Sequence, residues 1–305
     1  MIKLLAVDMD GTCLNSRSQM TDETLLALRR AAAAGITVVP ATGRNLGCIP
    51  HRLAAGALHE GNVPGHKTEC EKNKGLFRYV ITSNGAVVAD IREKRVLFQA
   101  MVPKEEAVSL LRDCRGIPLG RASHICHRYL MQGKLLTAAG YLFYGRDASG
   151  VYCVRDMEKI IRESRYGVEE MQFYFLSGDA KRRLRDVLKD YPGLSAAYTG
   201  IYAEIYSAEA SKGNALAALS RHLGISRREV ACIGDGENDL SMFSAAGMRI
   251  AMGNGVAGLM RRRRMPNMLN RLTCTPDASA SIHRPIGNIV KNTMMTIRIA
   301  IPMNR

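Results

Sequence analysis

Short apolar segments that end in small polar turns are the main feature of the hydrophobic pattern. They occupy residues 2–7, 36–39, 79–82 and 230–233, and residues 248–252 form a similar fifth segment. Continuous apolar runs of this kind are typical of strands that are buried on both faces of a parallel sheet. The pattern therefore predicts five strands, most of them followed by turns rich in Asp, Thr, Asn or Gly.

A helix is predicted between the first two strands. Thr21 is a suitable N-cap for residues 22–34, whose leucines and alanines supply an apolar face, and Gly35 provides a stop. Strands that alternate with helices favour an α/β fold with a doubly wound, Rossmann-like parallel sheet. Ligands of such sheets bind outside the carboxyl ends of the strands, which is where the polar turns fall.

The middle of the chain has a different pattern. Short alternating runs at residues 151–154 and 171–176 accompany helical stretches at 104–112 and 179–189. This pattern predicts a second, smaller α/β domain that is inserted into the first. We divide the chain into a first core segment (1–85), an inserted α/β cap (86–197), a second core segment (198–258) and an atypical basic tail (259–305).

Length and composition indicate a folded, soluble protein. The 305 residues are 47% hydrophobic, which is enough for a sizeable core. The first apolar run stops at Asp8 and is too short for a signal sequence or a membrane span, so we expect a cytoplasmic protein without a membrane partner. The eight cysteines form no CxxC pair, which favours reduced thiols over zinc sites or disulfides.

The formal charge of +15 raises the question of a polyanionic partner. The segment from Leu259 to Arg305 carries nine Lys or Arg residues against one acid, Asp277, so +8 of this charge belongs to the tail. The chain has no basic platform that is interleaved with aromatic residues. We therefore expect no nucleic-acid partner.

Candidate chemistry begins at Asp8 and Asp10, directly after the first predicted strand. Because their spacing is two, both carboxylates can approach one phosphoryl group past the end of the strand. Taken alone, an ordinary turn rich in Asp and Gly explains the pair equally well. Further polar groups follow in order along the chain: the Thr42 hydroxyl with the Gly43 amide, Lys212 at the start of a predicted helix, and the segment Gly234–Asp239.

These four segments, in this order, resemble the four motifs of the haloacid dehalogenase superfamily. The inserted domain and the long last motif are similar to the Cof-type branch of sugar-phosphate phosphatases. The resemblance covers about residues 1–253 and implies a phosphoric monoester hydrolase. It implies a Mg²⁺-dependent phosphatase that hydrolyses small phosphorylated metabolites, sugar phosphates or similar, through an aspartyl-phosphate intermediate on Asp8.

The resemblance also implies which residues act on the reacting groups. Asp8 is the expected nucleophile, and Asp10 is expected to protonate the leaving alkoxide and then to activate water. Mg²⁺ prefers oxygen ligands and masks the negative charge of the phosphate. The implied metal ligands are Asp8, the backbone carbonyl of Asp10, and Asp235.

Four residues are expected to bind the phosphate: Thr42, Gly43, Lys212 and Asn238. Asp239 is expected to orient the lysine or a metal-bound water. Each has a structural alternative, because Lys212 could be a solvated residue of a first helical turn and Thr42 could make only a local backbone bond.

Several other residues are left open. Arg44 either contacts the substrate or pairs with an acid, and Asn84 is either a ligand or part of a structural turn. We expect no metal cluster at the segment His124–His127, because a second set of ligands is missing. The candidates at the mouth of the cap are Tyr141, Tyr144, Tyr152 and Arg155, with core packing as the alternative for the tyrosines.

The resemblance ends after Gly255, where the chain becomes rich in Arg and Met. We interpret the tail as translated out of frame. Read one base back, Met265-Pro266 must give Ala, because the G of ATG precedes CC, and the following codons can give Glu, Tyr and Val. This string resembles the family's sequence at the same place. The alternative is a genuine basic tail.

Two other functions stay open at this point. One is a phosphomutase or phosphotransferase that uses the same intermediate, and the other is a non-catalytic polyanion-binding protein. The sequence does not identify the substrate, the cap residues that set specificity, or the oligomeric state.

Overall fold

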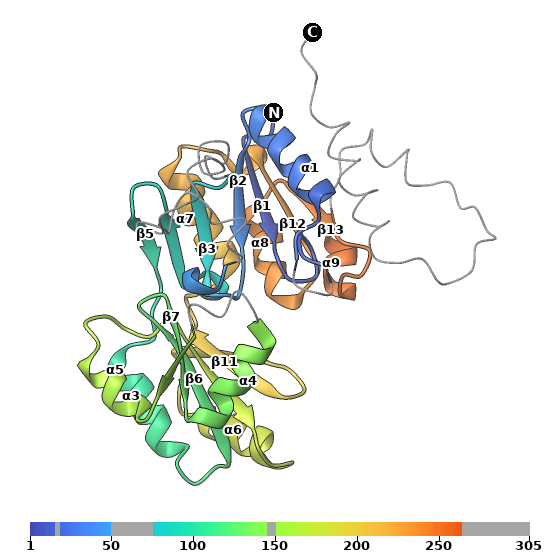
Figure 1. Cartoon of the computed structure of the whole chain (residues 1–305). Coiled ribbons are helices and arrows are strands. Elements are labelled where there is room, and N and C mark those ends of the chain that lie inside the picture. The colour runs from blue at the N-terminus through green and yellow to red at the C-terminus, as the bar shows by residue number, and fades with distance from the viewer. Residues whose placement is uncertain (16–18, 50–75, 145–150, 264–305) are drawn as a thin grey trace, which may run out of the picture.

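The computed structural model describes residues 1–15, 19–49, 76–144 and 151–263, which form a larger core domain and a smaller cap domain (Figure 1). Most of the tail, residues 264–305, lies outside the described residues, so its interpretation as out of frame stays a prediction. Within the described ranges, no helix is long and apolar enough to cross a membrane.

The core is built on a seven-stranded sheet. Its first five strands in spatial order are parallel, and the last two continue it as antiparallel strands. In that order the strands are β13 (Met248–Ala251), β12 (Val230–Gly234), β1 (Leu4–Asp8), β2 (Thr37–Ala41), β3 (Tyr79–Thr82), β4 (Val87–Asp90) and β5 (Arg95–Gln99).

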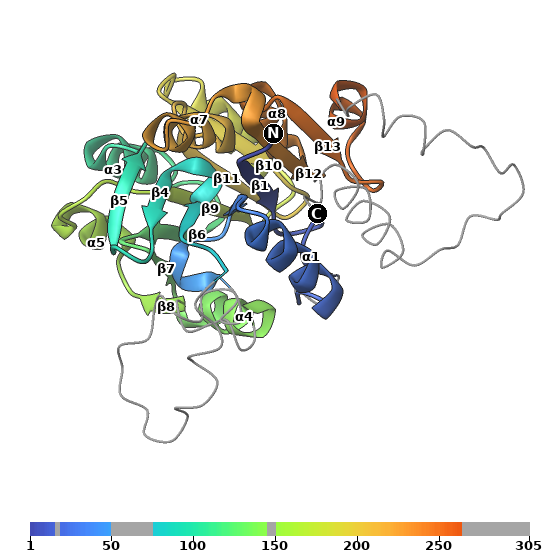
Figure 2. The ribbon, with the colours of Figure 1, turned by 90° about the horizontal axis from the view of Figure 1, so that it is seen from above.

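Helices cover both faces of this sheet, as Figure 2 shows. Successive side chains of a strand point to opposite faces. Leu5 and Val7 of β1 therefore pack with the side of α1, while Leu4 and Ala6 pack with the opposite helices. This arrangement explains the continuous apolar runs of the sequence. Among the described residues, the helices of the core are α1 (Asp22–Ala33), α7 (Lys212–His222), α8 (Leu240–Ala245) and α9 (Ala257–Arg262).

The cap is built on a six-stranded sheet that is antiparallel except for its last pair. Its strands in spatial order are β10 (Leu194–Tyr198), β11 (Tyr202–Ser207), β9 (Glu170–Phe175), β6 (Leu119–Ile125), β7 (Arg128–Gln132) and β8 (Val151–Val154). Three helices share one hydrophobic cluster with this sheet: α3 (Lys104–Asp113), α5 (Met157–Glu163) and α6 (Ala180–Leu188).

The other face of the cap sheet carries polar and aromatic side chains. On β9, Met171 and Phe173 point into the hydrophobic cluster, whereas Gln172 and Tyr174 point to the opposite face. Helix α4 (Lys134–Tyr144) packs on β7 and β8 at this face. The cap lies beyond the carboxyl ends of the core strands (Figure 1), and polar side chains of this sheet face line a cavity there together with core residues.

The structure confirms the predicted α/β class and most of the predicted elements. The strand at residues 79–82 and the cap strand at 151–154 have the predicted bounds, and α1 ends one residue before its predicted end. Thr21 caps α1, because its side chain accepts a hydrogen bond from the backbone N–H of Thr24 at 3.2 Å.

The cap boundaries differ from the predicted positions 86 and 197. Strands β4 and β5, after residue 86, pair with β3 in the core sheet, and the cap sheet continues through Ser207 at the end of β11. The physical reason is that short apolar strands of either sheet look alike in sequence, and only their pairing assigns them to a domain.

Candidate active site

The site forms where β1 ends between its two parallel neighbours. Asp8 is the last residue of β1, and β1 pairs with β12 on one side and β2 on the other. The strands that follow β1 in the chain lie on one side of it and those from the end of the core lie on the other, which makes this a topological switch point. Asp8 is 5% exposed, so its carboxylate is held in a largely desolvated place.

Lys212 joins two buried carboxylates at the first residue of α7. Its Nζ lies 2.5 Å from Oδ1 of Asp8 and 2.8 Å from Oδ1 of Asp239. The other oxygen of Asp239 accepts hydrogen bonds from the backbone N–H groups of Asp235 and Gly236, each at 2.9 Å. Asp239 therefore fixes both the lysine and the turn after β12, and Lys212 is a buried ion-pair partner rather than a solvated residue.

Asp235 is oriented by two hydrogen bonds from neighbouring loops. Its Oδ1 accepts a hydrogen bond from the Thr12 hydroxyl at 2.7 Å, and its Oδ2 accepts one from the Asn254 side-chain amide at 3.1 Å. Gly11 has a φ of +83°, and a Cβ there would lie 2.3 Å from Oδ2 of Asp235. Only glycine allows this close approach between the turn after β1 and the carboxylate.

The electrostatics of the site favour a bound cation. Burial raises the pKa of Asp8 to about 8, although Lys212 lowers it, and the nearby charges of Asp239 and Asp235 raise it further. Burial also raises the pKa of Asp235. Burial alone would lower the pKa of Lys212, but Asp8 and Asp239 raise it overall, so the lysine is charged.

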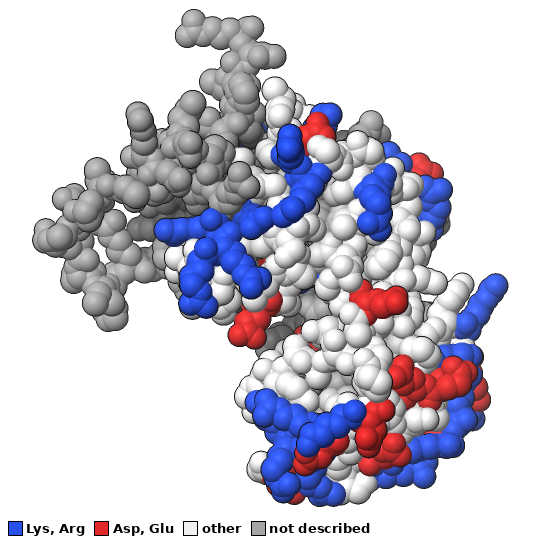
Figure 3. All heavy atoms as spheres, turned by 180° about the vertical axis from the view of Figure 1, so that it is seen from behind, with Lys and Arg blue, Asp and Glu red and all other residues white. Residues whose placement is uncertain are grey.

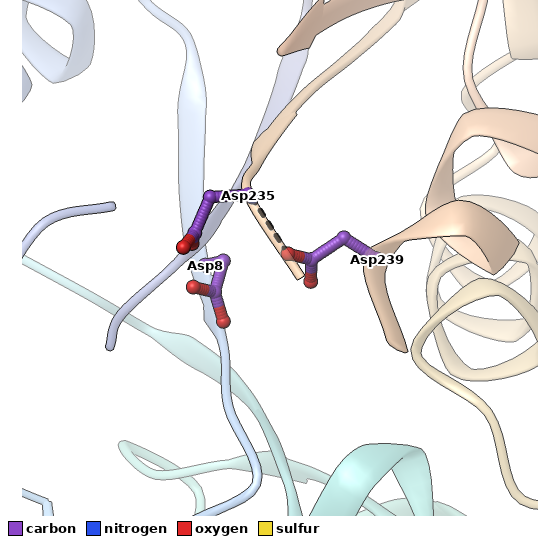
Figure 4. Close-up of side chains that lie close together, drawn as sticks. All are labelled: Asp8, Asp235 and Asp239. Atoms are coloured by element: carbon purple, nitrogen blue, oxygen red, sulfur yellow. Dashed lines mark hydrogen bonds between the residues drawn. The ribbon is translucent and has the colours of Figure 1, made fainter. Parts of the chain in front are cut away.

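Three carboxylates gather here, with one oxygen of each within 4.8 Å of the others: Asp8, Asp235 and Asp239. Figure 4 shows the carboxylates of Asp8 and Asp235 side by side, and the carboxylate of Asp239 reaches toward them from the turn after β12. Because Asp239 is committed to Lys212 and two backbone N–H groups, Asp8 and Asp235 are the better candidates for a cation. Oxygen-only donors fit a hard ion such as Mg²⁺.

Asp10 is held by Arg44 in a bidentate ion pair. Nε of Arg44 lies 2.9 Å from Oδ2 of Asp10, and Nη2 lies 2.7 Å from Oδ1. Arg44 is 7% exposed, whereas the side chain of Asp10 is 52% exposed and faces the cavity. Of the two alternatives for Arg44, the ion pair with an acid is therefore present. The carboxylate of Asp10 is not one of the three that gather at the candidate cation site.

The predicted phosphate-binding residues are brought to the same place in different ways. Gly43 and Asn238 line the cavity. Thr42 is 1% exposed, and its hydroxyl accepts a hydrogen bond from the backbone N–H of Arg44 at 3.1 Å, which is the local bond considered as its alternative. The side-chain amide of Asn238 donates to Oδ1 of Asn84 at 3.0 Å.

A cavity of about 560 Å³ lies between the core and the cap, with the carboxylates at its core end. The core contributes Asp8, Asp10, Gly43, Arg44, Asn84, Asp235, Gly236 and Asn238 to its lining. The cap contributes Met131, Leu136, Ala139, Gly140, Gln172, Tyr174, Ile201, Tyr202 and Glu204. The cap thus covers the site and can restrict water during a reaction.

Sequence reasoning missed the acids that connect the cap to the core. Asn84, with φ 54°, donates its side-chain amide to Oε2 of Glu170 and to Oε2 of Glu204, each at 2.9 Å. The available signal was alternation, because Tyr202 and Glu204 fall on one face of β11 and Ala203 and Ile205 on the other. The sequence did not indicate which face met the site.

Three of the predicted cap candidates, Tyr141, Tyr152 and Arg155, do not line the described cavity. The hydroxyl of Tyr141 donates to the backbone carbonyl of Val151 at 2.9 Å, and Tyr152 lies under the guanidinium of Arg128. Arg155 is exposed and does not belong to the cavity lining, and the side chain of Tyr144 lies outside the described part of the structure.

His124 is buried between the cap and the core turn after β3. His124 is 2% exposed, burial lowers its pKa to about 4, and its Nδ1 lies 3.2 Å from the hydroxyl of Ser83. Among the described residues, the side chains placed to hold a metal ion are the three aspartates at the end of β1 and β12.

Comparison with known proteins agrees with this geometry. The family profile described as haloacid dehalogenase-like hydrolase matches residues 5–262. YxeH of Bacillus subtilis is 29% identical over 285 aligned residues, which cover 84% of this chain and 89% of YxeH. Phosphatase YwpJ of Bacillus subtilis is 27% identical over 308 aligned residues, which cover 92% of this chain and 98% of YwpJ.

A solved structure has the same fold. A haloacid dehalogenase-like hydrolase from Bacteroides thetaiotaomicron superimposes with a TM-score of 0.70 at 22% identity, over 86% of this chain and 92% of that chain. The family match confirms the resemblance inferred from the four motifs, and with it the predicted class of enzyme, a phosphoric monoester hydrolase. The chain belongs to the haloacid dehalogenase-like hydrolase family.

Proposed function

We propose that this protein is a Mg²⁺-dependent phosphatase of small phosphorylated metabolites, sugar phosphates or similar, and that Asp8 is its nucleophile. The observation that carries the proposal is the position of Asp8 at the core end of a covered cavity, between Lys212 and Asp235. A cavity of about 560 Å³ suits a metabolite rather than a protein substrate.

Attack begins from the oxygen of Asp8 that does not bond to Lys212. The Oδ1 atom of Asp8 accepts from Nζ of Lys212, so Oδ2 is the nucleophilic oxygen. It forms a bond to phosphorus while the bond from phosphorus to the ester oxygen breaks, which leaves an aspartyl-phosphate and an alcohol. Lys212 offsets part of the negative charge that gathers between two anions.

Asp10 moves the protons in both halves of the reaction. It gives a proton to the leaving alkoxide, and it then takes one from the water that attacks the aspartyl-phosphate. Its carboxylate faces the cavity, as this role requires. Arg44 holds that carboxylate and also lines the cavity, so an arriving phosphate competes with Asp10 for the guanidinium.

Asp8 and Asp235 would hold the Mg²⁺ ion, which would supply the positive charge that lets a carboxylate approach a phosphate anion. The oxygen donors and the raised pKa of Asp8 and Asp235 fit such an ion. Thr12 and Asn254 hold the Asp235 carboxylate in place for it.

The first experiment is hydrolysis of p-nitrophenyl phosphate with Mg²⁺ and with a chelator, beside the variant Asp8→Asn. We expect turnover that requires Mg²⁺ and falls by about 10³-fold or more in the variant, because an amide is not a nucleophile of this kind. Mass spectrometry of quenched wild-type protein should find a phosphoryl group on Asp8.

The matched control is Asp22→Asn, the same change at an exposed acid in the first turn of α1. It should keep wild-type turnover. Metal-independent hydrolysis, or an active Asp8→Asn protein, contradicts the proposal. Release of inorganic phosphate in the presence of acceptor sugars separates hydrolysis from phosphotransfer, because a phosphotransferase would transfer the group to the sugar.

A further inference from the structure

The cap end of the cavity differs chemically from the end that carries the aspartates. Met131, Leu136, Ala139 and Gly140 supply an apolar wall from β7 and α4. A Cβ on Gly140 would lie 2.4 Å from Sδ of Met131, so α4 packs closely on β7. Beside this wall lies an aromatic pair whose ring centroids are 5.3 Å apart: Tyr174 and Tyr202.

Glu204 is the acidic group at this end. Its Oε2 accepts the Asn84 amide at 2.9 Å, and Tyr202 also donates a hydrogen bond to this carboxylate. A carboxylate has about four acceptor sites, so these two bonds leave acceptor capacity in the cavity lining. The leaving group of a substrate would therefore meet an acceptor here.

The neighbouring amide of Gln172 is already committed. Its Oε1 accepts from the hydroxyls of Tyr129 and Tyr174, and its Nε2 donates to Oε1 of Glu170 at 2.7 Å. Glu204 is therefore the stronger acceptor for a new donor at the cap end of the cavity.

The acids at this end are Glu170 and Glu204, whereas the cations of the core end are paired with other carboxylates. Lys212 is paired with Asp8 and Asp239, and Arg44 with Asp10. Burial raises the pKa of both Glu170 and Glu204, and it does so most for Glu170, which is 0% exposed. Against burial, the hydrogen bonds from Asn84 and Tyr202 and the charge of Lys212 lower the pKa of Glu204 and so favour its ionised form.

We propose that Glu204 selects phosphate esters whose leaving group carries a protonated amine on a body that packs against the apolar wall. This inference rests on the phosphatase function proposed above. An ammonium group would form a charge-assisted hydrogen bond with Glu204, beside the hydroxyl of Tyr202. A hydroxyl in its place would be neutral and would leave the buried charge of Glu204 without a counter-ion.

The test uses two pairs of esters that differ only in an amine or a hydroxyl. The pairs are pyridoxamine and pyridoxine 5′-phosphate, which have a flat aromatic body, and glucosamine and glucose 6-phosphate, which have a sugar body. We expect the wild-type kcat/KM to favour the amine by about tenfold or more in the pyridoxine pair, in line with a hydrogen bond to a charged group.

The preference should disappear in Glu204→Gln and survive in part in Glu204→Asp, which keeps the charge. Both esters of a pair are measured on one preparation, so partial unfolding lowers both constants equally and leaves their ratio unchanged. The control is Glu209→Gln, the same change on an exposed residue just after β11 that does not line the cavity. Its ratio should equal that of the wild type.

Dissociation constants of the same esters on Asp8→Asn separate selection from turnover. If the amine binds more tightly but no ester is hydrolysed by the wild type, the proposed function fails and the role of Glu204 stands. If the wild type hydrolyses the esters without preferring the amine, or if the preference persists in Glu204→Gln, the role of Glu204 is overturned. A higher kcat/KM for glucosamine 6-phosphate than for pyridoxamine 5′-phosphate contradicts packing against the apolar wall.

Discussion

Asp8 is an acid buried beside two other acids, an arrangement that a stability argument alone would disfavour. Lys212 offsets only part of the repulsion, because Asp239 shares its ammonium group. Burial raises the pKa of Asp8 to about 8, from an ordinary value of 3.8. The folded protein therefore stores unfavourable electrostatic energy at the atoms that the proposed reaction uses, as functional sites often do.

This stored energy predicts how stability depends on pH. Between pH values of about 4 and 8 the folded protein keeps a proton on Asp8 that the unfolded chain releases. The contribution of Asp8 to the free energy of unfolding is therefore fully present below pH 4 and is lost as the pH rises through 8. Without Mg²⁺, Asp8→Asn should raise the free energy of unfolding at pH 8 by on the order of 1 kcal/mol, or the Tm by a few degrees.

Thermal unfolding from pH 4 to 9 in the presence of a chelator measures this effect. The difference in Tm between Asp8→Asn and wild type should grow with pH, and Mg²⁺ should narrow it by binding the wild-type carboxylate. Asp22→Asn should follow the wild-type curve. Parallel curves for wild type and Asp8→Asn over the whole range would show that burial of Asp8 is electrostatically neutral.

At the residue scale, the sequence predicted the groups that follow strand ends and missed those that depend on domain packing. Asp8, Lys212 and Asp239 lie together as the order of strand ends indicated, because parallel strands bring their carboxyl ends to one edge. Asn84 and Glu204 are 120 positions apart and belong to different domains. Their contact follows from how the cap sits on the core, which no local pattern specifies.

At the scale of elements, two crossing segments connect the core to the cap. One joins β5 to α3 through residues 100–103, and the other joins β11 to α7 and ends at Ser211, whose side chain caps α7 by accepting a hydrogen bond from the Asn214 backbone N–H at 3.0 Å. Gly85 has a φ of +95°, and a Cβ there would lie 2.2 Å from the backbone carbonyl group of Ser211. The start of α7, and with it Lys212, therefore depends on the absence of a side chain at Gly85.

Gly85→Ala should lower both stability and activity. The positive φ and the backbone overlap together should lower the free energy of unfolding by about 2 kcal/mol or more. A shift of Lys212 away from Asp8 should lower kcat/KM by about 10-fold to 100-fold. Chemical denaturation and p-nitrophenyl phosphate kinetics measure the two effects.

The control for this variant is Gly35→Ala, just after α1. Gly35 has a similar φ of +82°, but a Cβ there meets no atom within 4 Å. Gly35→Ala should lower the free energy of unfolding by about 1 kcal/mol, which is the cost of a positive φ for alanine, and should keep the wild-type kcat/KM. Equal effects of the two variants would mean that the contact with Ser211 is unimportant.

Elements were easier to predict than their membership of a domain. The apolar segments that became β3 and β8 were recognised with their bounds, because their composition and flanking turns are local signals. Strands β4 and β5 were placed in the cap, yet β4 pairs with β3 through Val88 and Ile81 and extends the core sheet. Pairing of this kind is set by packing between elements, so the sequence of the strand alone does not indicate its partner.

At the scale of the whole molecule, the formal positive charge is concentrated in the tail, residues 259–305. On the face shown in Figure 3, basic and acidic side chains alternate over the cap domain. Since +8 of the +15 formal charge belongs to residues 259–305, the remainder of the chain carries +7. A polyanion-binding role would therefore depend mainly on the tail, whereas the proposed site does not include it.

The match to the family profile ends at residue 262, close to the point where the sequence becomes rich in Arg and Met. A shift of reading frame near this point would end the match to the family profile here. It would leave the residues of all four motifs unchanged, because they precede it. We predict that the gene carries a one-base slip near the codons for Gly255 to Met260. The corrected chain should regain the closing helix that the family resemblance implies, and its Tm should rise by about 5 °C or more.

DNA sequencing and thermal unfolding of the corrected protein test this prediction together. A genuine basic tail makes the opposite set of predictions: an intact reading frame, relatives that share the tail, and retention on heparin that disappears when residues 264–305 are removed. The present chain and the frame-corrected chain should release phosphate with the same dependence on Mg²⁺ and Asp8, because the carboxylates and Lys212 all lie before residue 262. Loss of activity on removal of the tail from an otherwise folded protein would instead make the tail a component of the enzyme.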